Sequence, residues 1–298
     1  MRHRSQGMLF TLMTLYLLLP SSVLGQASGA LDVGSLLRER DPAIVIGKED
    51  EDIQGKIGER WAQMVVEDSH TALKRNQTEL YPNPILQAYV NQLGQSLIPK
   101  EALNSIPISF KVVEDPLPYA DSLTTGTVYL STGMISLLDN ESQLAFLLMH
   151  EAGHVMLAHH VQQAIAQEKL ERKADKIKTL SKVALGLAGG ILGGGGKGDL
   201  LNKLNTGVLA YGGSKLGGFG AQKGLDIAGA FLNHRFMKEI QLESDQFAAQ
   251  ILLQNAFDVR EAPILMAKIG EIVHRSGAAT ELAFGDAGDL PQRSLKIK

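Results

Sequence analysis

Apolar residues recur every three or four positions through the first part of the chain, which is the spacing of amphipathic helices. The stretch from Ile53 to Leu97 contains IGERWAQMVVEDSH (57–70) and ILQAYVNQLGQSLI (85–98), and each of these carries an apolar stripe. The turn-forming residues YPNP (81–84) stand between them. The pattern therefore predicts two helices separated by a turn.

Two later stretches change to the shorter period of strands. ISFKVVED (108–115) is rich in β-branched and aromatic residues with partial alternation, and GTVYLSTG (126–133) is flanked by glycines. Both predict strands, and we expect them to pair as a small antiparallel sheet beside the helices. We further expect residues 126–133 to form the edge strand, along which an extended peptide binds through its backbone.

The helical period returns in DNESQLAFLLMHEAGHVMLAHHVQQ (139–163), and the charged sequence up to residue 178 allows the helix to continue. Asn140 is placed to cap the start of this helix. Gln143 follows three residues later, which is the spacing of a capping box. The pattern predicts a long helix that begins near Asn140 and carries most of the histidines.

A glycine-rich segment comes next. Residues 186–229 hold 16 of the 31 glycines, separated by Leu, Ala and Ile. This composition favours close helix packing or a mobile lid, with membrane insertion as the alternative. Helical spacing resumes at 232–254 and 262–274. The predicted fold class is therefore α+β: a mainly helical domain with a small β-sheet beside the histidine-rich helix.

The N-terminal residues have the three-part order of a secretory signal. Arg2 and Arg4 precede the apolar run MLFTLMTLYLLL (8–19), and the small-residue tail SSVLG follows. We expect a signal peptide at 1–25, a lead-in at 26–52, and the folded domain at 53–298 with the glycine-rich insert at 186–229. The protein is then exported, and it is periplasmic or envelope-associated in a bacterium.

Composition narrows the chemistry. The chain of 298 residues has no cysteine, which excludes disulfides, thiolate zinc sites and cysteine nucleophiles. Its net charge of −3 gives no sign of a basic face, so we expect no nucleic-acid partner. Four of the eight histidines fall within LLMHEAGHVMLAHH (147–160). That concentration in an apolar stretch indicates a metal site.

The spacing of these histidines supports this interpretation. His150 and His154 lie about 40° apart around a helix and about 6 Å apart along it, so both imidazoles can bind one zinc ion per chain. Glu151 is offset by about 100°, where it can act as general base on a zinc-bound water. This is the logic of the HExxH motif. His159 and His160 are turned off the ligand face, which favours a surface or supporting role.

A catalytic zinc site needs a third protein ligand besides the two histidines. No further H-x-x-x-H spacing follows, so we expect a carboxylate on a second helix, for which QLESDQFAAQ (241–250) is the best candidate. Charge favours Glu243 within this stretch, because a carboxylate completes the His₂Glu set of catalytic zinc.

These residues also carry a family resemblance. Three features resemble the M48 gluzincin peptidases, which are the HtpX-like and CAAX-prenyl-protease-like metallopeptidases. They are HEAGHV, the ESDQFA that follows about 90 residues later, and the glycine-rich insert between them. The secreted bacterial envelope branch is most similar. The resemblance extends to ILQAYVNQLGQSL, VEDPLPYADSLTTGTVYLSTGMISLL, NAFD and LPQR. It implies a zincin-type fold from about Ile46 onward and a zinc-dependent endopeptidase.

The resemblance gives a different third ligand. In this family the ligand is a glutamate four residues before a characteristic aspartate. If Asp245 is that aspartate, the ligand position is Gln241, while Glu243 is the nearest carboxylate. Both assignments stay open, and we expect Asp245 to orient a ligand histidine through its ring N–H. The chain also has Ala287 where the family has a histidine, and Tyr119-Ala120 where it has Asn-Ala.

Two functions follow from these observations. The first is a zinc metalloendopeptidase that hydrolyses misfolded or unassembled envelope proteins, with Glu151 as general base. The second is a proteolytically weak or inactive member of the fold that acts as an envelope chaperone or scaffold, because a neutral amide is a poor zinc ligand. Either would take polypeptides as partners, outer-membrane proteins among them. The glycine-rich segment or an uncleaved signal would provide membrane association.

Overall fold

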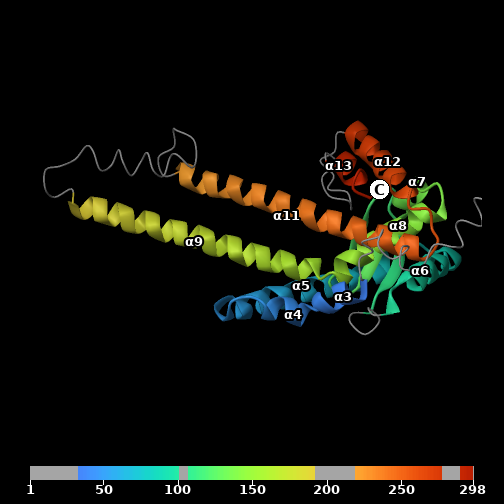
Figure 1. Ribbon diagram of the computed structural model, residues 1–298, viewed down its shortest axis with the longest axis horizontal. Helices are drawn as coiled ribbons and strands as arrows, with labels where there is room; N and C mark the ends of the chain where they lie inside the picture. The colour runs from blue at the N-terminus through green and yellow to red at the C-terminus, as the bar shows by residue number, and fades with distance from the viewer. Residues whose placement is uncertain (1–32, 101–106, 192–218, 277–288, 298) are drawn as a thin grey trace, which may run out of the picture. The chain divides into compact units, whose positions relative to one another are not determined.

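The structure is a computed structural model that describes residues 33–100, 107–191, 219–276 and 289–297 (Figure 1). The signal expected at 1–25, most of the glycine-rich insert and Ala287 lie outside these residues. The strands are β1 (Ser109–Val113), β2 (Ala120–Ser122) and β3 (Thr127–Ser131). The helices are α3 (Val33–Glu39), α4 (Pro42–Gly47), α5 (Glu51–Thr78), α6 (Pro84–Leu97), α7 (Thr132–Leu137), α8 (Glu141–Met156), α9 (His159–Ile191), α11 (Phe219–Gln254), α12 (Glu261–Ser276) and α13 (Leu290–Ser294).

The α+β fold class is confirmed. The described chain is mainly helical with one small sheet, and helices and strands lie where the apolar pattern predicts them, apart from a break in the helix expected from residue 139 onward. Helices α3 and α4 lie within the segment expected to be a lead-in, and α4 packs against α5 and α9. In the described residues, no helix combines the length and the apolar character needed to cross a membrane.

The sheet differs from the predicted antiparallel pair. Its strand order is β1-β3-β2, with β1 parallel to β3 and β2 antiparallel to β3. The expectation that residues 126–133 form the edge strand is therefore wrong, because β3 is the central strand. Strand β2 was not predicted. It is only three residues long and contains an aspartate and a serine, so its sequence does not indicate a strand.

The outer edge of β1 is covered by side chains of α6. Gln87 donates to the carbonyl of Val112 at 2.7 Å and accepts from its N–H at 3.0 Å. Asn91 accepts from the N–H of Phe110 at 3.1 Å. Together with backbone hydrogen bonds with Glu79 and Tyr81, these amides cover the outer side of β1. In the described sheet, β2 is therefore the edge strand without such cover.

Helix α8 is buried along most of its length. Asn140 caps it by accepting from the N–H of Gln143, as expected from the sequence. Every residue from Gln143 to Met156 is buried, because α8 packs against α11, α12, α6 and the strands β2 and β3. His150, Glu151 and His154 therefore lie inside the core.

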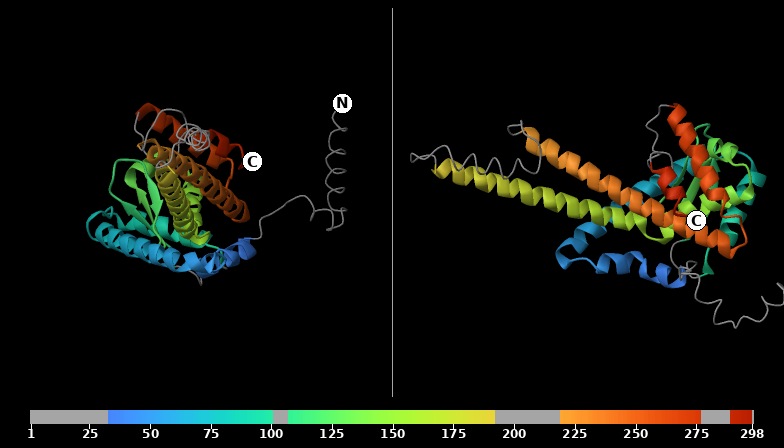
Figure 2. Two further views of the ribbon diagram at one scale, coloured as in Figure 1. Left: turned by 90° about the vertical axis from the view of Figure 1, so that its left-hand side faces the viewer. Right: turned by 45° about the horizontal axis from the view of Figure 1, so that its top comes forward.

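The helix expected from residue 139 onward is interrupted. Helix α8 ends at Met156, and α9 begins at His159. Ala158 between them has φ of 54°, in the left-handed region that no helical residue adopts. Beyond this break α9 runs beside α11, as both views in Figure 2 show. The change of direction decides where His159 lies.

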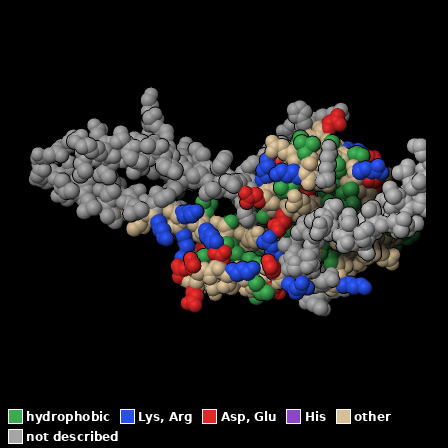
Figure 3. All heavy atoms as spheres, in the orientation of Figure 1, with side chains coloured by type: hydrophobic (Ala, Val, Ile, Leu, Met, Phe, Trp, Pro, Cys, Tyr) green, Lys and Arg blue, Asp and Glu red, His purple; other side chains and the backbone are tan. Residues whose placement is uncertain are grey.

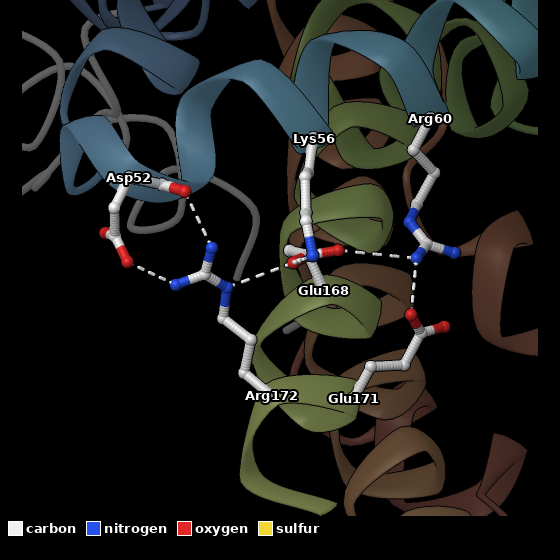
Figure 4. A network of polar contacts seen from close by, with 6 residues as sticks. All are labelled: Asp52, Lys56, Arg60, Glu168, Glu171 and Arg172. Carbon is white, nitrogen blue, oxygen red and sulfur yellow. Dashed lines mark hydrogen bonds and ion pairs between the residues drawn. The ribbon is translucent and has the colours of Figure 1, made fainter. Parts of the chain in front are cut away.

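A network of charged groups joins α9 to α5 (Figure 4). The side chain of Glu168 is 4% exposed, and it accepts from Arg172 at 3.0 Å and from Arg60 at 3.4 Å. Lys56 lies 3.9 Å away, and Arg172 also binds Asp52. On the face shown in Figure 3, acidic and basic side chains are interspersed over these helices. The network links α9 to α5 through a buried carboxylate, and loss of its charged donors would be strongly unfavourable.

Candidate metal centre

Two imidazoles and one amide oxygen converge between α8 and α11. The Nε2 atoms of His150 and His154 lie 3.3 Å apart, and Oε1 of Gln241 lies 3.0 Å from Nε2 of His150. All three side chains are buried. The structure thus brings together both histidines of the motif and the glutamine at the family's third-ligand position.

The outer nitrogen of His150 faces a carboxylate. Its Nδ1 lies 2.9 Å from Oδ1 of Asp245, and Arg293 donates to both oxygens of Asp245 at 2.7 and 2.8 Å. Burial alone would raise the pKa of Asp245, but the hydrogen bonds from His150 and Arg293 lower it. Asp245 is therefore an anion that fixes the proton of His150 on Nδ1, which leaves a lone pair on Nε2.

Glu151 lies next to this cluster on the side of the sheet. It is 2% exposed, and its Oε1 has no hydrogen-bond partner among the described residues. Burial raises the pKa of Glu151 well above its usual range, and the nearby Asp121 of β2 raises it further, while a hydrogen bond with Ser122 opposes both. A buried carboxyl with a free oxygen is suited to proton transfer.

His154 is contacted by a residue that the sequence placed away from the ligand face. His159 is 1% exposed, and its Nδ1 lies 2.9 Å from Nδ1 of His154. No pattern in the sequence indicates this contact, because on an unbroken helix the two residues point about 140° apart. The break at Ala158 places His159 beside His154.

Glu243 lies outside the converging atoms. Its Oε2 is 3.2 Å from Nε2 of His159, and its Oε1 accepts from Arg40 at 2.5 Å. Within the described residues, no three His, Cys, Asp or Glu side chains form a group that could hold a metal ion. The donor set at His150 and His154 is instead two imidazole nitrogens, which are common zinc ligands, and the amide oxygen of Gln241, which would hold zinc more weakly than a carboxylate.

A close approach of the two helices holds this geometry. Gly153 of α8 faces Ser244 of α11, and a Cβ at Gly153 would lie 2.6 Å from the Ser244 hydroxyl. That hydroxyl donates to the carbonyl of His150. Gln241 is carried one turn earlier on α11, so this contact sets its distance from His150.

Comparison with known proteins identifies part of the chain. Residues 84–187 match the family model described as Peptidase family M48. The matched range includes His150, Glu151 and His154 and ends before α11. This segment is similar to peptidase family M48. This finding confirms the resemblance drawn from HEAGHV and its surroundings, and it agrees with the α+β fold.

Curated proteins are also similar to this chain, at modest identity. The beta-barrel assembly-enhancing protease of Yersinia pestis is 25% identical over 209 residues, which are 70% of this chain and 38% of that protein. That of Escherichia coli (strain K12) is 23% identical over 220 residues, 74% of this chain and 40% of that protein. The putative beta-barrel assembly-enhancing protease of Vibrio cholerae is 27% identical over 97 residues, 33% of this chain and 20% of that protein. The chain thus spans about two fifths of the length of the first two relatives.

Proposed function

We propose that this protein is a zinc-dependent metalloendopeptidase in which His150, His154 and Gln241 hold one zinc ion. The observation that carries the proposal is the convergence of their three donor atoms beside Glu151, a buried carboxyl with an unpartnered oxygen. The M48 domain match supports peptide hydrolysis. Glu243, which charge favoured as the third ligand, contacts His159 and Arg40 instead.

Each residue has a defined role in this chemistry. Zinc, when bound, supplies a Lewis acid for the scissile carbonyl and for water. Glu151 takes a proton from the attacking water and passes it to the leaving amine. Asp245 holds His150 in the tautomer that presents Nε2, and the apolar surroundings of α8 exclude bulk solvent from the proton transfer.

The peptide substrate is proposed to lie along β2. This strand has a partner on one side only in the described sheet, and it packs against α8 near Glu151. Addition of an extended peptide to such an edge supplies affinity through backbone hydrogen bonds without demanding a particular sequence. That mode suits a peptidase acting on unfolded chains.

The proposed substrates are misfolded or unassembled envelope proteins, including those of the outer membrane. The relatives are named for enhancing β-barrel assembly, and the N-terminal sequence has the order of an export signal. We therefore place the protein in the periplasm or at the envelope of a bacterium. Polypeptides are its proposed partners.

A second function is favoured by Gln241 itself. A neutral amide donates less charge to zinc than a carboxylate does, so the metal is held less tightly. A weakly loaded centre fits a protein that binds unfolded envelope proteins as a chaperone or scaffold and cleaves them slowly. The two functions differ in whether hydrolysis depends on Glu151.

The test compares three forms of the purified protein: wild type, Glu151→Gln and Gln241→Glu. We expect wild type to hold one zinc by elemental analysis and to cleave casein, and Glu151→Gln to keep the zinc while losing about 10²–10⁴-fold in rate. Gln241→Glu should bind zinc more tightly and cleave faster, because it restores a carboxylate ligand. A wild-type protein that holds zinc and binds casein without cleaving it would favour the scaffold function. A wild-type protein without zinc would refute the metal centre.

A further inference from the structure

The hydrogen bonds beyond His154 run in one direction. A neutral imidazole that presents Nε2 to a metal carries its proton on Nδ1. Nδ1 of His154 then donates to Nδ1 of His159, 2.9 Å away, which must accept. The proton of His159 is therefore on Nε2, which donates to Glu243 Oε2 at 3.2 Å. Each ring donates away from the metal position, and the chain ends on a carboxylate.

The far end of this chain is fixed by a cation from another part of the fold. Arg40, in the turn between α3 and α4, donates to Oε1 of Glu243 at 2.5 Å. The Arg40 and Glu243 side chains are 28% and 29% exposed, so the pair borders solvent while His159 does not. With Oε1 occupied by Arg40, the carboxylate is oriented so that Oε2 meets His159.

A ligand role for Glu243 would break both of these contacts. Its carboxylate would have to leave Arg40 and His159 to reach the metal position. The N–H of His159, whose side chain is 1% exposed, would then lose its acceptor, and an unsatisfied buried donor is unfavourable. The geometry thus assigns Glu243 to the support of a ligand.

We propose that His159 and Glu243, anchored by Arg40, form a positioning relay that holds His154 in the tautomer and orientation that bind metal. His159 and Glu243 are positioning residues, because neither touches the metal position itself. This inference rests on the proposed function, since it assumes that His154 is a zinc ligand. It gives His154 a support that corresponds to the one Asp245 gives His150.

The experiment measures the zinc dissociation constant by competition with a chelator. We expect His159→Leu and Glu243→Ala each to weaken zinc binding about 10–100-fold. The double variant should be no more than about threefold worse than either single variant, because both changes break the same chain. Glu243→Gln keeps an acceptor oxygen for His159, so it should restore affinity to within about threefold of wild type.

Matched controls separate the relay from general effects. His160→Leu removes the neighbouring histidine, and Glu239→Ala removes an exposed carboxylate one turn earlier on α11. Both should bind zinc as wild type does. Unfolding midpoints of the metal-free proteins identify any variant that fails to fold, in which case Glu243→Gln and Glu243→Ala, at a half-buried position, decide the question.

A spectroscopic measurement distinguishes support from ligation. The cobalt-substituted Glu243→Ala protein should keep the band intensities of the wild type, because the number of ligands is unchanged. Additive losses in the double variant, failure of Glu243→Gln to restore binding, or a changed cobalt spectrum would make Glu243 a ligand and overturn the relay. Wild-type affinity in every variant would also overturn it. If the wild type binds zinc, any of these results overturns the relay alone and leaves the proposed function standing. If the wild type binds no zinc, both the relay and the proposed function are overturned.

Discussion

Two buried carboxyl groups beside the same histidine have opposite electrostatic surroundings. Burial raises the pKa of Glu151, and Asp121 adds to this effect. Burial also acts on Asp245, but the hydrogen bonds from His150 and Arg293 outweigh it and lower the pKa of Asp245. One carboxyl is thereby prepared to carry a proton, and the other is a fixed negative charge. Opposite pKa shifts of neighbouring groups are a feature of catalytic sites.

Loss of the Asp245 carboxylate should destabilise the protein strongly. Asp245→Ala removes the carboxylate that accepts two hydrogen bonds from the buried guanidinium of Arg293, and breaking a buried ion pair in this way costs about 3–5 kcal/mol of unfolding free energy. Urea denaturation of the metal-free protein measures this loss. Asp245→Ala should also weaken zinc binding, because His150 loses the acceptor of its Nδ1 proton.

An exposed ion pair provides the matched control. Arg260 binds both oxygens of Asp258, as Arg293 binds both oxygens of Asp245, but its side chain is 85% exposed. Arg260→Ala should leave the urea midpoint unchanged, because exposed pairs contribute little. A similar small effect in Asp245→Ala would show that the buried pair does not stabilise the fold.

At the scale of elements, the contact between α8 and α11 sets both packing and chemistry. Helix α8 supplies His150, Glu151 and His154, and α11 supplies Gln241 and Asp245. The two helices approach so closely at Gly153 that no side chain fits there. The proposed metal centre therefore depends on this helix pair, and the distance between its two halves follows from the absence of a side chain at Gly153.

Gly153→Ala should separate the two helices. The added methyl group would lie 2.6 Å from the Ser244 hydroxyl and 3.1 Å from the Phe247 ring, and such overpacking costs about 1–3 kcal/mol. Zinc affinity should fall as well, because α11 carries Gln241 away from His150. Urea denaturation and chelator competition measure the two effects.

Gly58→Ala on α5 is the control for this change. A Cβ at Gly58 meets nothing within 4 Å, so alanine should stabilise the helix by about 0.5–1 kcal/mol without altering zinc binding. If Gly153→Ala had the same stabilising effect, the close approach would not constrain the helices.

At the scale of the whole molecule, burial of a histidine makes stability depend on pH. Burial lowers the pKa of His160 from 6.5 to about 4. Below pH 6.5 the unfolded chain takes up a proton that the folded chain refuses, so stability is lost as the pH falls from 6.5 towards 4. His160→Gln removes this contribution.

The comparison is made on metal-free protein at pH 7.5 and pH 5. The wild type should lose about 1–2 kcal/mol more unfolding free energy between these values than His160→Gln does. Urea midpoints measure the difference. Equal losses in both proteins would place the His160 pKa near its ordinary value.

Much of this molecule follows from local patterns in the sequence. The apolar spacing predicted helices where α5, α6, α8, α11 and α12 lie and strands where β1 and β3 lie, and the Asn140 cap is present. The i, i+4 spacing predicted that His150 and His154 point together, and their Nε2 atoms lie 3.3 Å apart. These features depend on residues close in sequence, so a pattern can reveal them.

The remaining features depend on contacts between distant segments. Strand β1 pairs parallel with β3, and the three-residue strand β2, which lies between them in sequence, pairs antiparallel on the far side of β3. The contacts of Glu243 with His159 and Arg40 join residues 84 and 203 positions apart. Ala158 is no glycine, so its left-handed conformation left no mark in the sequence. Tertiary packing decides each of these features, and local propensity carries little information about it.

The break at Ala158 also has a consequence for how such a chain can change in evolution. An insertion within a continuous helix rotates everything beyond it by about 100° per residue. Helix α8 ends before α9 begins. Turns added to or deleted from α9 after His159, or from α11 before Gln241, therefore leave the angular positions of His150 and His154 unchanged. The lengths of α9 and α11 can thus change under selection, while the spacing of the residues within HEAGH cannot change at all.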